Sequence, residues 1–250
     1  MRLTPLVIAA IAAAVVVPAQ ASGIALAPTQ DTFGRAAEPG LTYGGAGGLS
    51  VSGPAAVNAA GEANGVFATW LMFDAAAAAA QFDAEFGAGN WSLASATLTV
   101  NEVGAPNNPI FNRGVGAFEV RYLADDDWAE GTGSANSPGT ATGNQIGYGY
   151  GISLLGNDDE SLGTFTNLGT TGLRSLGLAT TAGFGDDVLS GGLVSLYFTH
   201  VDDAVGFTFN SQSTPFPPQL ELEAIAIPAP PVAAMALVGM IAGRRRRRRS

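Results

Sequence analysis

Short runs of alternating apolar and polar residues recur along this chain and constrain it to β structure. The four clearest runs lie at 96–100, 118–122, 193–198 and 220–225. A period of two places one face of a strand in a core and the other face in solvent. Turn-forming residues separate the runs, as at Gly44-Gly45 and Gly191-Gly192. Many short strands punctuated in this way predict an all-β domain, either a sandwich or a barrel.

One segment departs from this pattern and predicts a short helix. Residues 74–86 contain six consecutive alanines, the residue type with the highest helix propensity. Asp74 belongs to the residue types that cap helix N-termini. Because the segment lacks a broad apolar stripe, we expect it on the surface between strands. Residues 134–143 are polar and are expected to form a loop. No repeat or linker divides the body, which predicts one domain over residues 22–226.

The first 21 residues contain the three parts of a secretory signal peptide. Arg2 provides a short positive region, and residues 6–17 form an apolar run of 12 residues. Ala19 and Ala21 are the small residues of a signal-peptidase site, so we expect cleavage after Ala21. The apolar run is short for a membrane span, and a retained N-terminal anchor is the alternative.

The last segment, residues 227–250, contains a second targeting pattern. Pro228-Ala229-Pro230 precedes an apolar run at 232–243, which we expect to form a hydrophobic helix that inserts transiently into the membrane. Six arginines follow, beginning with Arg244, Arg245 and Arg246. A basic cluster holds its end of the chain in the cytoplasm during export.

This order of parts resembles the PEP-CTERM sorting signal, with Ala229 where that family has glutamate. The resemblance implies an exosortase-like sorting partner that removes the tail, as other processed C-terminal signals are removed. It also implies delivery to the cell envelope or the extracellular surface. A simple membrane anchor and a basic tail that binds nucleic acid are the alternatives.

Missing residue types exclude several kinds of chemistry. The chain contains no cysteine, no lysine and one histidine, His200. Disulfides, thiolate or multi-histidine zinc sites, cysteine nucleophiles and Schiff-base lysines are therefore excluded. Between the terminal segments, four arginines face 21 acidic residues, a formal charge of −17. This charge argues against a nucleic-acid partner and favours neutral ligands or cations.

Five fragments of the body follow one another in order between residues 28 and 225. They are Asp31-Thr32-Phe33, Tyr43-Gly44 with Leu49-Ser50-Val51, Leu71-Met72-Phe73-Asp74, Ser95-Ala96-Thr97-Leu98 and Asp127-Trp128-Ala129-Glu130-Gly131. This order resembles the DNRLRE family, also grouped as carbohydrate-binding module family 96. An arginine that usually precedes the Phe-Asp strand is replaced here by Ala68-Thr69-Trp70. The resemblance implies a jelly-roll-like antiparallel β-sandwich and a polysaccharide partner.

Aromatic residues are the candidate ligand-binding groups, because an indole or phenol ring can stack on the partly apolar face of a sugar. Trp128 lies beside three aspartates, with a structural corner as the alternative. Tyr148 and Tyr150 share one face if the glycine-tyrosine repeat around them is a strand. Trp70 lies in an apolar run and is expected in the core, whereas Trp91 is expected to fill a loop.

Acidic side chains gather at 125–127, 158–160, 186–187 and 202–203. Calcium takes about six to eight oxygen ligands, which loop carboxylates supply. The preferred structural calcium site is Asp125, Asp126 and Asp127 with Glu130, and solvated turn residues are the alternative. No other cofactor is expected.

The scarcity of catalytic residue types favours a protein without enzymatic activity. His200 is expected at a turn after a strand, and the carboxylates show no spacing typical of a catalytic pair. We therefore expect an exported, surface-sorted β-sandwich that acts in adhesion, in an extracellular matrix or in polysaccharide association. The alternative is a secreted glycan-active enzyme that uses two carboxylates.

Overall fold

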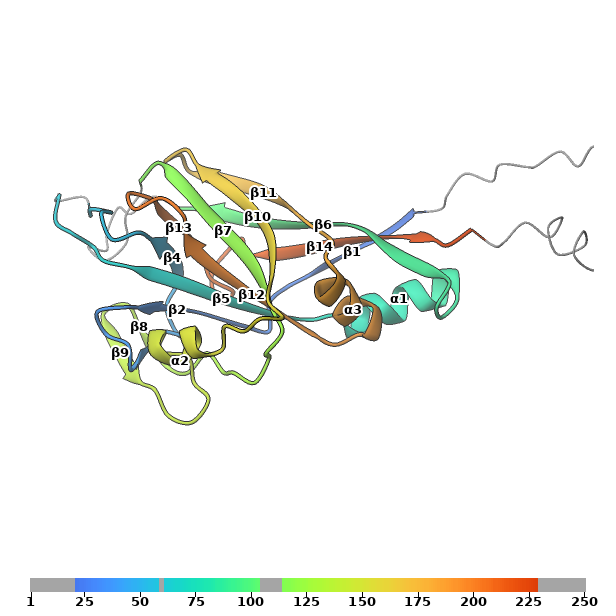
Figure 1. Ribbon diagram of the computed structural model, residues 1–250, viewed down its shortest axis with the longest axis horizontal. Helices are drawn as coiled ribbons and strands as arrows, with labels where there is room; N and C mark the ends of the chain where they lie inside the picture. The colour runs from blue at the N-terminus through green and yellow to red at the C-terminus, as the bar shows by residue number, and fades with distance from the viewer. Residues whose placement is uncertain (1–20, 59–60, 104–113, 229–250) are drawn as a thin grey trace, which may run out of the picture.

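The computed structural model describes residues 21–58, 61–103 and 114–228, in which antiparallel strands form a β-sandwich (Figure 1). The residues of the expected signal peptide before Ala21 lie outside the described part, and Ala19 is among them. The expected hydrophobic helix, Ala229, Pro230 and Arg244–Arg246 lie outside it as well. The all-β prediction is confirmed.

Five strands form the first layer of the sandwich. In pairing order they are β2 (Gln30–Arg35), β5 (Phe67–Asp74), β12 (Leu193–His200), β7 (Gly116–Leu123) and β10 (Glu160–Asn167). Val194, Leu196 and Phe198 of β12 belong to the main core, and the residues between them face the other side of the layer. His200 ends β12 and precedes a turn, as expected.

Four strands form the second layer, and a further pair joins the two layers. The second layer contains β1 (Ala21–Leu26), β14 (Gln219–Ala226), β6 (Trp91–Glu102) and β11 (Gly172–Leu178), in pairing order. The joining strands are β4 (Gly48–Ser52) and β13 (Gly206–Asn210). β4 pairs with β5 at Ser52, and β13 pairs with β6 at Phe209. The Phe118 and Phe207 rings stack at 4.4 Å in the core between the layers.

The four predicted alternating runs all lie in strands, namely in β6, β7, β12 and β14. The burial pattern of β14 shows why apolar and polar residues alternate in these runs. Its Leu220, Leu222 and Ala224 are buried, whereas Glu221 and Glu223 are exposed. One side of this layer therefore faces the core and the other faces solvent.

The described residues contain three helices, so the prediction of a single helix was wrong in number. They are α1 (Ala76–Phe86), α2 (Tyr148–Ser153) and α3 (Ala182–Ser190). α3 escaped prediction because two glycines lower its helix propensity. No helix in the described part of the chain has the length and apolarity needed to cross a bilayer.

α1 lies within the predicted segment 74–86 and packs more closely than expected. The Asp74 carboxylate accepts a hydrogen bond from the Ala76 N–H at 2.9 Å, although Ala75 is the N-cap residue. Phe82 is buried and its ring meets the Trp91 ring at 5.0 Å. Trp91 begins β6 and donates from Nε1 to Asp83 at 2.7 Å. Trp91 therefore fixes α1 to the sandwich rather than filling a loop.

A small sheet replaces part of the loop predicted over 134–143. It contains β3 (Leu41–Thr42), β9 (Ser137–Thr140) and β8 (Gly133–Ser134). β9 is polar and carries no alternation, and its pairing with the distant β3 stabilises it. The loop prediction was wrong for β9 because such long-range pairing leaves no local pattern.

Candidate functional site

The outer face of the first layer is only partly covered. Residues 124–154, which we name the covering segment, include α2, β8 and β9 and lie below this layer in Figure 1. Trp70, Tyr197 and Trp128 form a second buried cluster between the layer and the covering segment. This cluster explains why β5 is buried on both faces and shows no alternation.

Trp128 is an internal contact of the covering segment. Only 3% of its surface is exposed, and its Nε1 donates to the buried Ser195 hydroxyl at 2.9 Å. The ring is therefore not displayed for stacking on a sugar, and the structure favours the structural-corner alternative. Trp70 is fully buried, as predicted.

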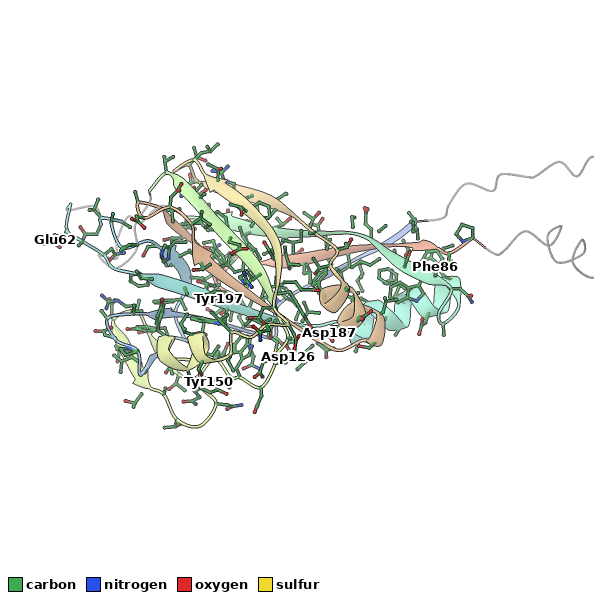
Figure 2. The ribbon with its side chains drawn as sticks, viewed as in Figure 1. Glu62, Phe86, Asp126, Tyr150, Asp187 and Tyr197 are labelled. Atoms are coloured by element: carbon green, nitrogen blue, oxygen red, sulfur yellow. The ribbon has the colours of Figure 1, made fainter. Side chains whose placement is uncertain are left out.

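Tyr148 and Tyr150 lie in α2, so the prediction that they share a strand face was wrong. Residues two apart on a helix point in different directions. Tyr148 meets the Trp70 ring edge-on at 6.4 Å, whereas the Tyr150 hydroxyl donates to the Asp127 carbonyl at 2.9 Å. Figure 2 shows Tyr150 at α2, away from Tyr197 in the layer above. The two tyrosines form no common platform.

A groove of about 490 Å³ opens on the outer face beside the covering segment. It is lined by Glu119 and Arg121 of β7, Tyr197 and Thr199 of β12, and Leu155, Gly156, Asn157 and Asp159 between α2 and β10. Ligand sites in proteins commonly have volumes of about 300–1,000 Å³. The groove is therefore large enough for a small ligand or for part of a polymer.

The strand register forms the floor of the groove. Tyr197 lies opposite Arg121, and Thr199 lies opposite Glu119. All four project outward, because core residues such as Phe198 occupy the alternate positions. Tyr197 is also paired with Trp70, whose ring lies 5.3 Å from its own. Tyr197 is thus packed against the buried Trp70 ring on the same face of the layer, and only 3% of its own surface is exposed.

Burial raises the pKa of the Tyr197 phenol to about 12, and a hydrogen bond with Thr199 opposes this increase. The phenol is therefore neutral at physiological pH, and its oxygen can both donate and accept a hydrogen bond.

Charge in the groove is nearly balanced. The Arg121 Nη1 lies 3.7 Å from the Glu119 carboxylate, and its Nη2 donates to the Asp159 carbonyl at 3.4 Å. The Asp159 carboxylate accepts hydrogen bonds from the Ala124 and Gly156 N–H groups. Asp159 therefore holds the wall of the groove against the end of β7. One arginine and two carboxylates give the lining a formal charge of −1.

A second polar cluster joins Asp31, Glu130 and Gln212 away from the groove. The Glu130 carboxylate accepts from the Asp31 N–H at 3.0 Å and from the Gln212 side chain at 2.7 Å. The Asp31 carboxylate accepts from the Gln212 N–H. Burial raises the pKa of Asp31 to about 7, with the Gln212 N–H lowering it and Glu130 raising it. This cluster fixes the edge of β2 and brings two of the five ordered fragments together.

The four residues considered for calcium bond to other protein groups, and Asp126 shares a side-chain hydrogen bond with Ser195. The Asp125 carboxylate accepts from the Asp127 N–H at 2.9 Å, and Asp127 accepts from the Asn144 side chain at 3.0 Å. Glu130 is directed toward Asp31. Over the described ranges, no three Asp, Glu or His side chains gather into a group that fits a metal ion.

Sequence reasoning placed three of the groove-lining residues, Glu119, Arg121 and Tyr197, in strands but did not select them as a site. The usable signal was alternation, because Glu119, Arg121 and Tyr197 occupy outward positions of two predicted strands. Thr199 lies one residue beyond the second predicted run, in the part of β12 that continues it. That β7 and β12 are neighbours depends on long-range pairing, which the sequence does not reveal.

No protein-family model matches the chain, and a search of curated proteins finds no match.

Proposed function

We propose that this chain is an exported, surface-sorted protein without enzymatic activity that associates with polysaccharide in the cell envelope or extracellular matrix. The observation that carries the proposal is the groove over β7 and β12. In this proposal the sandwich belongs to the jelly-roll type that the DNRLRE resemblance implies.

The chemistry of the groove suits a sugar polymer. The exposed Leu155 side chain offers an apolar surface. The Asn157, Thr199 and Arg121 side chains offer hydrogen-bond donors. Glu119 and Asp159 offer acceptors. A sugar ring presents apolar C–H groups on its faces and hydroxyls at its edge, so it can use both kinds of contact. The groove is open, which allows a chain to continue beyond it.

The terminal segments support the proposed location. Ala19 and Ala21 provide the cleavage site of an export signal, and the tail beginning at Pro228 resembles a PEP-CTERM signal. An exosortase-like enzyme would be the sorting partner, with transient insertion of the tail in the membrane.

Affinity electrophoresis of the full-length chain through gels containing single polysaccharides tests the proposal. We expect at least one polymer to retard the wild type, and Asn157→Ala with Thr199→Ala to weaken this retardation about tenfold. Ser95→Ala, on the outer face of the second layer, is the matched control and should leave it unchanged. Absence of retardation by every polymer would contradict the proposal.

A glycan-active enzyme is the second candidate, because Glu119 and Asp159 line the same groove from different elements. Glycoside hydrolysis needs two carboxyl groups across a bound sugar. Release of reducing ends from a retained polymer, abolished by Glu119→Gln or Asp159→Asn, would establish this function instead. Retardation without product release supports the binding function.

A further inference from the structure

We infer that the groove selects neutral, hydroxyl-rich glycans over acidic ones, and that Glu119 sets this selectivity by pairing with Arg121. The inference rests on the proposed function, because it names the class of glycan that the same groove takes. It follows from three features of the groove. They are the net charge of its lining, the partners of Arg121, which is the basic residue in that lining, and the acidic residues around Arg121.

Arg121 is the single basic residue in the lining. A carboxylated sugar would need this guanidinium as its partner, because arginine matches a carboxylate with two parallel hydrogen bonds. The guanidinium already forms an ion pair with the Glu119 carboxylate at 3.7 Å, and its Nη2 donates to the Asp159 carbonyl at 3.4 Å. An incoming carboxylate would compete with Glu119 for the guanidinium and would lie close to a second negative charge.

Acidic residues around the groove also disfavour the binding of an acidic glycan. Asp158 and Glu160 flank Asp159 in the chain, and the body as a whole carries a formal charge of −17. Such a field repels an acidic polymer before contact. A neutral glycan meets no such repulsion.

Hydroxyl groups fit the existing pairs without breaking them. A hydroxyl donates one hydrogen bond and accepts others, so it can bridge the Glu119 carboxylate and the Arg121 guanidinium at the same time. Thr199 and Tyr197 lie opposite these two residues in the register, with further hydroxyls. The floor therefore presents alternating acceptors and donors at the spacing of neighbouring strands, about 5 Å.

Glu119→Gln tests the selectivity, because it removes one negative charge and releases Arg121 while keeping the shape of the side chain. Wild-type full-length chain should bind a neutral polymer such as a β-glucan about tenfold more tightly than alginate at low salt. Neutral binding should change by less than about twofold between roughly 50 and 300 mM salt. In Glu119→Gln we expect alginate binding to rise about tenfold and to weaken with salt.

Glu221→Gln is the matched control, because this exposed glutamate lies on β14 in the other layer. It removes the same charge from the body without touching the groove, so it should leave the preference for neutral polymer unchanged. Equal thermal stability of the three proteins establishes that each is folded.

Tighter binding of alginate than of neutral polymer by the wild type would overturn the inference while leaving the proposed function in place. An unchanged preference in Glu119→Gln would also overturn it. Absence of binding to both polymers, and to a cationic chitosan, would contradict the proposed function itself.

Discussion

The carboxyl group of Asp31 is buried at a cost in free energy that the rest of the fold offsets. It is 1% exposed, and its Oδ1 has no hydrogen-bond partner. Burial raises its pKa from 3.8 to about 7. The folded state therefore binds a proton at this carboxyl more tightly than the unfolded state does. The resulting stability is fully present below about pH 4 and is lost as the pH rises through about 7.

We expect Asp31→Asn to remove this pH dependence. Asparagine resembles the protonated carboxyl and keeps an oxygen that can accept from the Gln212 N–H. Each unit of pKa difference corresponds to about 1.4 kcal/mol, so the variant should be more stable than the wild type at pH 8 and similar at pH 4. Urea unfolding at several pH values measures the difference. Asp203→Asn, at an exposed turn position, is the control, and an equal gain there would assign the effect to net charge.

The Trp128–Ser195 hydrogen bond permits a second test at the residue scale. Ser195→Ala leaves the buried indole N–H without its acceptor, which should cost about 1–3 kcal/mol of unfolding free energy. Adding Trp128→Phe removes that donor, so the double variant should lose less than the sum of the two single variants. Additive losses in a denaturation cycle would show that the hydrogen bond contributes little.

At the scale of elements, the strands with one face in solvent could be predicted from the sequence. The elements that other parts of the chain cover could not. β14 alternates because one side of it faces solvent. β5 has seven consecutive buried residues, because the covering segment lies on its second face. The glycine-tyrosine repeat of α2 has the period of a strand, yet it forms a helix. The groove depends on the pairing of β7 with β12, and such non-local contacts leave no trace in local sequence.

α2 gives the clearest prediction at this scale. A Cβ at Gly151 would lie 2.4 Å from Cζ2 of the buried Trp70 ring. Alanine normally stabilises a helix relative to glycine by about 1 kcal/mol, but overpacking a rigid core costs about 1–3 kcal/mol. We therefore expect Gly151→Ala to lower the unfolding free energy, as measured in urea.

Gly149→Ala is the matched control in the same helix. Its Cβ would lie 3.4 Å from Pro39, which is an ordinary contact distance. This variant should be neutral or slightly stabilising. If both variants lost the same amount of stability, the packing of Gly151 against Trp70 would not explain the loss.

At the scale of the whole molecule, the two described ends of the chain leave the sandwich side by side. Ala21 at the start of β1 pairs with Ile225 near the end of β14, and the start of β1 and the end of β14 lie at the same end of the sandwich in Figure 1. The covering segment and groove belong to the other layer. A sandwich held at the membrane by its tail would thus keep the groove on a face that does not carry the tail.

This arrangement allows both terminal segments to be removed with the loss of only the Ala21–Ile225 pair from the described sheet. Cleavage after Ala21 removes one residue from β1, whereas cleavage beyond about Pro230 falls after β14, which ends at Ala226. We expect mass spectrometry of protein from the native cell envelope to find a chain that begins at Ser22 and lacks Arg244–Arg249. The mature and full-length forms should unfold at nearly the same urea concentration, because cleavage takes only Ala21 from the strands of the described part of the chain.

Replacement of the six arginines by glutamine separates sorting from simple anchoring. The arginines should hold the tail end in the cytoplasm while the sorting enzyme acts, so their loss should release unprocessed protein to the medium. A scrambled tail that keeps the arginines and the apolar run, but separates Pro228 from Pro230, should remain membrane-bound and uncut. Intact arginines on the wild-type protein in envelope fractions would instead identify the tail as a permanent anchor. The charge of −17 would then belong to a body tethered by its own cationic end.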